Sequence, residues 1–233
     1  MFQALHLLVP AKADPERDAV ARAWESGGGT VHRLERFWNP PELPPARTRL
    51  YGNDTFCLVV AQKLGLTLVS PPDDLLLRVR PERLLREVHG ATLASVTTGP
   101  FPRFIKPLVP KVFRASVWRD AEALAEECRG LTPDTPVLSS EVVPLRAEAR
   151  AWVLDGRVRS CALYEGTGDV EEARGVLEAI ARDAPLPRAC VLDAAWVEGR
   201  GWALLEANAA WGAGLNGCDA TEAARCIAVA THD

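Results

Sequence analysis

The chain of 233 residues can form one large domain or two small ones, and 48% of its residues are hydrophobic while 25% are charged. Its net charge of −4 provides no general basic field for nucleic acid. No apolar run reaches the length of a membrane span, and the N-terminus lacks the basic residues of a signal peptide. We therefore expect a cytoplasmic protein with neither a nucleic-acid nor a membrane partner.

The first third of the chain alternates between strand-like apolar runs and segments with helix-start signals and helical spacing. The predicted elements are a strand, a helix, a strand, a helix and a strand at 2–10, 14–26, 30–37, 54–64 and 66–69. This order is typical of a small parallel sheet of the α/β class.

From about residue 80 onward, antiparallel signals predominate, so we expect a boundary at 72–82 and an α+β remainder. Asp155-Gly156 is a strong turn signal and predicts a hairpin of 148–154 and 157–164. The other predicted elements are strands at 101–106, 112–118 and 137–143, and helices at 73–77, 81–88, 120–129, 170–182 and 220–230.

A second hairpin, within Cys190–Gly217, carries the most informative polar residues. Counting back along both strands from the loop 198–201 sets Asp193 opposite Glu206, and alternation puts Asn208 on the face of Glu206. Two carboxylates and a carboxamide oxygen suit Mg²⁺ that shares its coordination shell with phosphates. An ordinary hairpin with an acidic residue at each end is the alternative.

Lysine is scarce: the chain has four lysines among 27 basic residues, and two of them, Lys106 and Lys111, lie close together. Lys106 ends a predicted strand, and Lys111 follows a loop bounded by prolines. A compact ammonium group held at a strand end can bind phosphate. The alternative is a pair of solvated loop lysines.

Two further segments suggest a ligand. Arg150 shares an apolar strand face with Glu148, so it needs an anionic partner, either a carboxylate such as Glu148 or a ligand phosphate. Glu141, Val142 and Val143 end a strand before a proline, where backbone groups can bind a purine edge while valines pack on its faces. A plain strand leading into a turn is equally consistent with this second segment.

The order of these signals resembles the ATP-grasp enzymes, and most closely the clade named for two arginines and a lysine. The resemblance rests on FIKPLVPK, SEVVPLRAEARAWVLDGRV and VLDAAWVEGRGWALLEANAAWGAG, and it runs from about residue 80 to the end. It implies an ATP-grasp fold in three parts: a small α/β domain over 1–79, a lid subdomain over 80–139 and a C-terminal subdomain with the metal site over 140–233.

The resemblance also implies roles for individual residues. Lys106, Lys111 and Arg150 would contact the phosphates of ATP, and Asp193, Glu206 and Asn208 would hold Mg²⁺. The Glu141–Val143 backbone would bind adenine, and Glu148 would contact ribose or support Arg150. The chain departs from the family where Ala209 and Ala210 replace a common proline, and where the loop after Lys106 contains proline rather than glycine.

The function implied is Mg-ATP-dependent ligation of a carboxylate to an amine through an acyl-phosphate. A nucleotide-binding module without catalysis and a small-molecule kinase are the alternatives. Substrates could be small molecules or peptides, with Arg146, Asn216 and the proline-rich loop 39–45 as candidate lining residues. The closing helix is short enough that a second copy of the chain could cover it, as in a homodimer.

Overall fold

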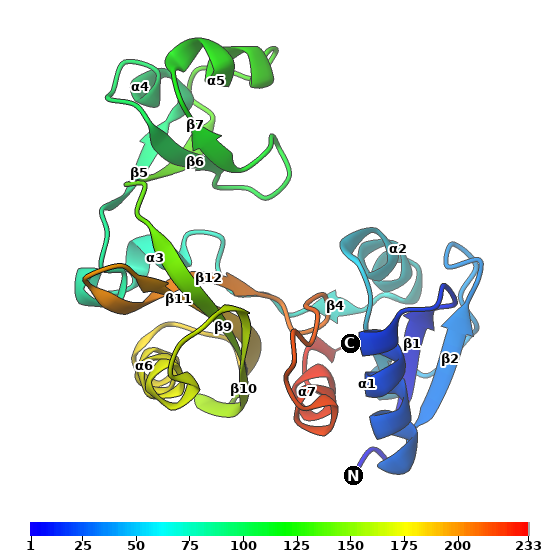
Figure 1. Cartoon of the computed structure of the whole chain (residues 1–233). Coiled ribbons are helices and arrows are strands. Elements are labelled where there is room, and N and C mark those ends of the chain that lie inside the picture. Colours follow the sequence, from blue (N-terminus) through cyan, green and yellow to red (C-terminus); the bar gives the residue numbers. More distant parts are fainter. Residues whose placement is uncertain (233) are drawn as a thin grey trace.

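The computed structural model describes residues 1–232, which form three lobes (Figure 1). In Figure 1 the N-terminal lobe lies at the right, a central antiparallel sheet at the lower left, and a third lobe above that sheet. Within residues 1–232, every helix is too short or too polar to cross a membrane.

The N-terminal lobe is built on a parallel sheet with strand order β2-β1-β3. Its strands are β1 (His6–Pro10), β2 (Thr30–Leu34) and β3 (Thr48–Leu50), and its helices are α1 (Pro15–Ser26) and α2 (Asp54–Leu64). The side chain of Asp14 caps α1, and Gly65 in the left-handed conformation ends α2. Both helices therefore begin and end where the sequence predicts.

The third strand of this sheet is a correction to the sequence analysis. The segment expected at 66–69 is only β4 (Thr67–Leu68), and it pairs with β13 (Thr231–His232) rather than joining the parallel sheet. The place beside β1 is taken by β3, which the sequence analysis missed. β3 has only three residues and directly follows a proline-rich loop, so it has too little alternation to be recognised.

The central sheet has the strand order β10-β9-β11-β12, and all of its pairs are antiparallel. Its strands are β9 (Leu145–Leu154), β10 (Arg157–Gly166), β11 (Ala189–Val197) and β12 (Gly201–Asn208). Helix α6 (Val170–Asp183) packs Ala173, Leu177 and Ile180 against one face of the sheet. The opposite face contacts α7 (Ala220–Ile227) at one end only, through residues such as Trp152 and Val191.

The third lobe is a four-stranded antiparallel sheet with the order β5-β8-β6-β7. It consists of β5 (Val88–Thr92), β6 (Arg103–Pro107), β7 (Ser116–Trp118), β8 (Pro136–Ser140), α4 (Leu93–Val96) and α5 (Ala121–Glu127). Ile105 and Val137 pack in the core with α4 and α5. Phe104 and Lys106 alternate with Ile105 along β6, so they face away from that core.

The connection into this lobe differs from the expected helix at 81–88. Only Pro81–Arg83 forms a short 3-10 turn, after helix α3 (Leu75–Arg78), and Val88 already begins β5. Pro81 set the expected helix start, but the pairing of Val88 with Ser140 makes the end of the segment a strand. Tertiary pairing therefore overrides the local helix signal.

Candidate active site

The second hairpin places Asp193 directly opposite Glu206, as predicted, but its loop length and strand register differ from those expected. The loop is one residue shorter than expected, because Val197 pairs with Gly201 rather than with Trp202. A register shift between Asp193 and Ala194, with Leu205 unpaired, restores the predicted pairing. This β-bulge turns Glu206 and Asn208 away from the α6 face, toward which Leu204 points.

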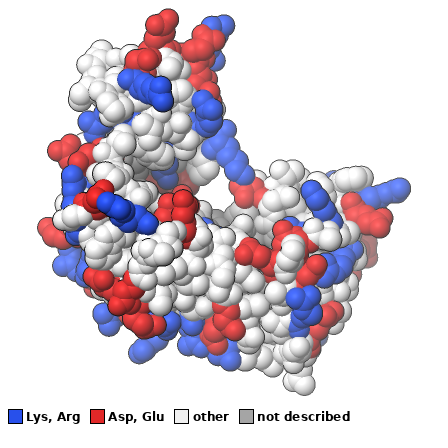
Figure 2. Space-filling view, viewed as in Figure 1, with Lys and Arg blue, Asp and Glu red and all other residues white. Residues whose placement is uncertain are grey.

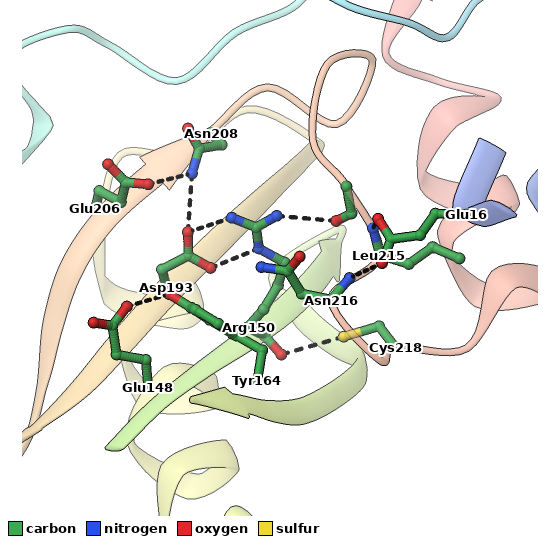
Figure 3. Close-up of polar contacts among 11 residues, drawn as sticks. Glu16, Glu148, Arg150, Tyr164, Asp193, Glu206, Asn208, Leu215, Asn216 and Cys218 are labelled. Carbon is green, nitrogen blue, oxygen red and sulfur yellow. Dashed lines mark hydrogen bonds and ion pairs between the residues drawn. The ribbon is translucent and has the colours of Figure 1, made fainter. Parts of the chain in front are cut away.

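Asp193 and Arg150 form a buried ion pair at the centre of this open face (Figure 3). Arg150 Nε donates to Asp193 Oδ1 and Arg150 Nη2 to Oδ2, both at 2.7 Å, and Asp193 is only 1% exposed. Burial raises the pKa of Asp193, and the guanidinium opposes that shift. The anionic partner that Arg150 needs is therefore Asp193 across the sheet, and not Glu148.

Asn208 lies between the two carboxylates of the hairpin. Its Nδ2 is 3.0 Å from Asp193 Oδ2 and 2.9 Å from Glu206 Oε1. A hydrogen-bond donor thus sits where a cation would balance the two negative charges. Rotation of the amide would turn its oxygen to the same point, giving three hard oxygen donors, which is the ligand chemistry that Mg²⁺ prefers. The residues present therefore fit a magnesium ion.

Tyr164 on β10 connects Glu148 to Arg150. The Tyr164 hydroxyl donates to Glu148 Oε2 at 2.5 Å, and the Arg150 guanidinium lies 5.7 Å from the centre of the Tyr164 ring. Burial and the hydrogen bond to Glu148 raise the pKa of Tyr164, so the hydroxyl stays a donor. Glu148 is thereby fixed beside Arg150 through a residue that the sequence analysis did not single out.

A cavity of about 360 Å³ lies between the central sheet and the third lobe. Its apolar lining includes Phe104, Leu138, Val142 and Val143, and its polar lining includes Lys106, Glu141, Glu148 and Glu206. Val142 is 41% exposed although it is apolar. In the described chain no protein group accepts a hydrogen bond from the Val143 N–H. A flat, largely apolar ligand with a hydrogen-bonding edge would satisfy both features.

A second cavity of about 630 Å³ adjoins the first and shares its Lys106 and Glu206 lining. It extends along the loop 107–115 toward Pro71 and Pro72, and Lys111 and Asn208 line it. The space-filling view shows the surface hollowed between the third lobe and the N-terminal lobe, with side chains of both charges along the hollow (Figure 2). Within residues 1–232, Lys106 makes no ion pair with an acidic residue, and it stands where the two cavities meet.

Lys111 and Glu141 already have partners within the protein. Lys111, with a φ of 67°, forms an ion pair with Asp54 at the start of α2. The Glu141 carboxylate binds both terminal nitrogens of Arg200, at 3.0 and 2.7 Å, which lowers its pKa to about 2. The Glu141 N–H donates to the Glu87 carbonyl, and the Glu141 carbonyl accepts from the Ser140 hydroxyl at 3.0 Å, so one carbonyl lone pair remains for an adenine edge.

The proposed substrate residues lie outside the two cavities. Arg146 forms an ion pair with Glu198, and the Asn216 N–H donates to Glu16 Oε1 at 2.8 Å. Neither residue lines either cavity, and neither does the loop 39–45. These assignments remain predictions, although Asn216 belongs to a loop whose Gly214 carbonyl accepts from Arg150 Nη1 at 3.0 Å.

Arg86 was also missed by the sequence analysis, although it lines the smaller cavity. It donates to the carbonyls of Leu204 and Leu205 at 2.8 and 3.3 Å, and so holds the bulge that orients Glu206. Burial lowers the pKa of Arg86. In the sequence it is one arginine among many, and no local pattern marks its contact, 118 residues away along the chain.

The fold is that of the ATP-grasp proteins, as solved structures show. A RimK domain ATP-grasp protein from Sphaerobacter thermophilus has a TM-score of 0.62 at 16% identity, over 95% of this chain and 99% of that chain. The D-cycloserine synthetase DcsG has a TM-score of 0.57 at 13% identity, over 96% and 98%. N5-carboxyaminoimidazole synthase from Aspergillus clavatus has a TM-score of 0.61 at 9% identity, over 98% and 78%.

The chain belongs to an ATP-grasp domain family, the second family of the clade named for two arginines and a lysine, whose model matches residues 84–226. This match confirms the resemblance found in the sequence. No curated protein matches the chain.

Proposed function

We propose that this protein is a Mg-ATP-dependent carboxylate–amine ligase that forms an amide or peptide bond through an acyl-phosphate. The observation that carries the proposal is the junction of the two cavities at Lys106 and Glu206. A nucleotide in the smaller cavity would direct its phosphates to this junction, and the larger cavity has room for the other substrates.

The smaller cavity suits an adenine ring. The Glu141 carbonyl would accept from the exocyclic amine, and the Val143 N–H would donate to a ring nitrogen. Val117, Val142 and Leu145 are 47%, 41% and 40% exposed, and a bound base would cover part of this apolar surface. Each square ångström of apolar surface removed from water contributes about 25 cal/mol.

Asp193, Glu206 and Asn208 would hold Mg²⁺, which when bound neutralises phosphate charge and aligns the phosphate oxygens. Lys106 and Arg150 would balance the charge that develops on the transferred phosphoryl group. Arg150 binds both Asp193 oxygens through Nε and Nη2, so these two nitrogens reach a phosphate only if the ion pair rearranges. Release from Asp193 would free two guanidinium nitrogens to face a phosphate.

The reaction proceeds in two displacements. A substrate carboxylate oxygen bonds to the γ-phosphorus while the bond from that phosphorus to ADP breaks, giving an acyl-phosphate. The amine nitrogen then bonds to the acyl carbon, phosphate leaves, and the amine proton passes to phosphate or solvent. The loop 107–115 over the larger cavity would exclude water that would otherwise hydrolyse the acyl-phosphate. The substrates would be small molecules or peptides.

A nucleotide-binding module without ligase activity is the second candidate. One observation favours it: both Asp193 oxygens already accept from Arg150, and Asp193 Oδ2 also accepts from Asn208, so the metal site is not ready-made. The two candidates differ in whether a phosphoryl group ever reaches a carboxylate.

The test is to incubate the protein with Mg-ATP, pooled carboxylic acids and hydroxylamine, and to measure ADP and hydroxamate. Hydroxylamine attacks an acyl-phosphate, so a ligase gives hydroxamate in proportion to ADP. A phosphorylated product stable to hydroxylamine would indicate a kinase. ATP binding without ADP formation from any pool would favour the binding module.

A further inference from the structure

We propose that Glu16, in the N-terminal lobe, is a positioning residue for Arg150, and that it acts through the loop 214–216. This inference rests on the proposed function for its catalytic consequence. Glu16 lies outside the residues 84–226 that match the family model, so the family match assigns it no role.

Glu16 binds two successive backbone amides of that loop (Figure 3). Its Oε2 accepts from the Leu215 N–H at 2.9 Å and its Oε1 from the Asn216 N–H at 2.8 Å. Asn216 has a φ of 47°, in the left-handed region that non-glycine residues seldom adopt. The loop is therefore held in an uncommon conformation that presents both amides to one carboxylate.

The other side of the same loop contacts Arg150. The Gly214 carbonyl accepts from Arg150 Nη1 at 3.0 Å, while Nε and Nη2 bind Asp193. All three guanidinium nitrogens are thus engaged, two by the sheet and one by the loop. The peptide group that joins Gly214 to Leu215 therefore has Arg150 on its carbonyl side and Glu16 on its N–H side. A Cβ at Gly214 would lie only 2.7 Å from Glu16 Oε2, so glycine permits this close approach.

Glu16 is not the only anchor of the segment that contains this loop. The Gly52 N–H donates to the Trp211 carbonyl at 3.0 Å, and the Tyr51 hydroxyl donates to the Ala213 carbonyl at 2.9 Å. These two contacts hold the preceding residues on the N-terminal lobe without Glu16. Loss of Glu16 should therefore release 214–216 and the Arg150 contact while the lobes stay together.

The experiment compares the full chain with Glu16→Gln, Glu16→Ala and a matched control, Glu25→Ala, an exposed residue of the same helix. Three quantities are measured: hydrogen exchange at Leu215 and Asn216, the NMR signal of the Arg150 Nε–H, and the Mg-ATP Kd together with the rate of ADP formation. Glu16→Gln retains one accepting oxygen, so it still tests the proposal if the alanine variant does not fold.

We expect Glu16→Ala to raise exchange at both amides, shift and broaden the Arg150 signal, and lower ADP formation at least tenfold with the Mg-ATP Kd within about twofold. Glu16→Gln should show the same changes to a smaller extent, and Glu25→Ala none. Faster exchange with an unchanged Arg150 signal would overturn the proposal, because Glu16 would then stabilise only the loop. If the wild type neither binds nor hydrolyses ATP, the proposed function fails, and the Arg150 signal alone decides the positioning role.

Discussion

Asp193 and Arg150 form the most deeply buried ion pair in the described chain, and each side chain balances the charge of the other. The Asp193 side chain is 1% exposed and that of Arg150 11%. Without its partner, Asp193 would be a buried carboxylate whose only remaining side-chain donor among residues 1–232 is Asn208. A buried charge left in this way is strongly destabilising.

Arg150→Met should therefore lower the free energy of unfolding by about 3–5 kcal/mol. Arg159→Met is the matched control, because it removes the more exposed ion pair with Glu222 and should cost at most about 1 kcal/mol. Urea denaturation followed by fluorescence measures both. Equal losses of unfolding free energy in the two variants would contradict this expectation, because the Arg150–Asp193 pair would then stabilise the fold no more than the more exposed pair does.

Glu141 makes the stability of the folded state depend on pH in the acidic range. Arg200 lowers the pKa of Glu141 from its ordinary value of 4.5 to about 2, so the folded state holds this proton more weakly than the unfolded state does. The stabilisation is therefore complete above pH 4.5 and is lost as the pH falls toward 2.

Glu141→Gln should remove this part of the pH dependence. Its stability should fall less steeply than that of the wild type between about pH 4.5 and 2. Urea unfolding at a series of pH values tests this, with Glu165→Gln as an exposed control that forms no salt bridge among the described residues. Parallel curves for wild type and Glu141→Gln would contradict it.

At the scale of elements, the two faces of the central sheet have different roles. One face packs against α6 in the core, and the other carries the candidate site residues. Ala149 and Ala151 on β9 face α6, whereas on the opposite face Glu148 lines the smaller cavity and Arg150 pairs with Asp193. Leu177 of α6 is fully buried against the first face. A change there should alter packing without touching the site.

Leu177→Ala should lower the free energy of unfolding by about 2–5 kcal/mol, the usual range for a buried leucine. The Mg-ATP Kd should stay within about twofold, since the variant leaves the other face intact. Val176→Ala, at a partly buried neighbouring position, should cost less. A large loss of affinity in Leu177→Ala would show that the two faces are coupled.

Local signals predicted most of the helices and both hairpins. Capping residues, the Asp155-Gly156 turn and apolar spacing each depend on only a few neighbouring residues, so the sequence shows them directly. They also predicted that Asp193 faces Glu206, although by a loop count that the bulge at Leu205 happens to correct. They could not predict the Arg150–Asp193 pair or the contact of Glu16 with Leu215, which join residues 43 and 199 positions apart. The first contact forms only when β9 pairs with β11, and the second only when the N-terminal lobe packs against the loop 214–216.

At the scale of the whole molecule, we propose that 1–79, 80–139 and 140–233 act as N-terminal domain, lid and metal-binding subdomain. One core cluster, from Leu93 to Val137, lies wholly within 80–139 and supports this division, whereas the other two clusters cross the proposed boundaries. The closing residues nevertheless pack with the first lobe, since α7 contacts α1 and β13 pairs with β4. The loop from Ala209 to Gly217 therefore joins the first lobe to the hairpin of β11 and β12.

The ion pair of Lys111 with Asp54 joins the third lobe to the N-terminal lobe. If Lys111 must leave Asp54 to reach a phosphate, the ion pair competes with ATP. An exposed ion pair is worth about 0.2–1 kcal/mol. Removing it should therefore favour nucleotide binding by a few-fold at most.

Asp54→Asn should lower the Mg-ATP Kd about two- to fivefold, and added salt should reduce the difference from wild type. Asp74→Asn is the control, because Asp74 pairs with Arg78 instead. Calorimetric titration at low and high salt measures both variants. Weaker binding in Asp54→Asn would mean that the ion pair supports the binding-competent arrangement of the lobes.

The most direct test of the proposed site is calorimetric titration of ATP, with and without Mg²⁺, into the wild type and Glu206→Gln. Glu206 lies where the two cavities meet and is one of the three proposed Mg²⁺ ligands, so both parts of the proposal depend on it. We predict Mg²⁺-dependent binding that Glu206→Gln weakens at least tenfold, about 1.4 kcal/mol. Equal binding by the two proteins, or no binding by either, would contradict the proposal.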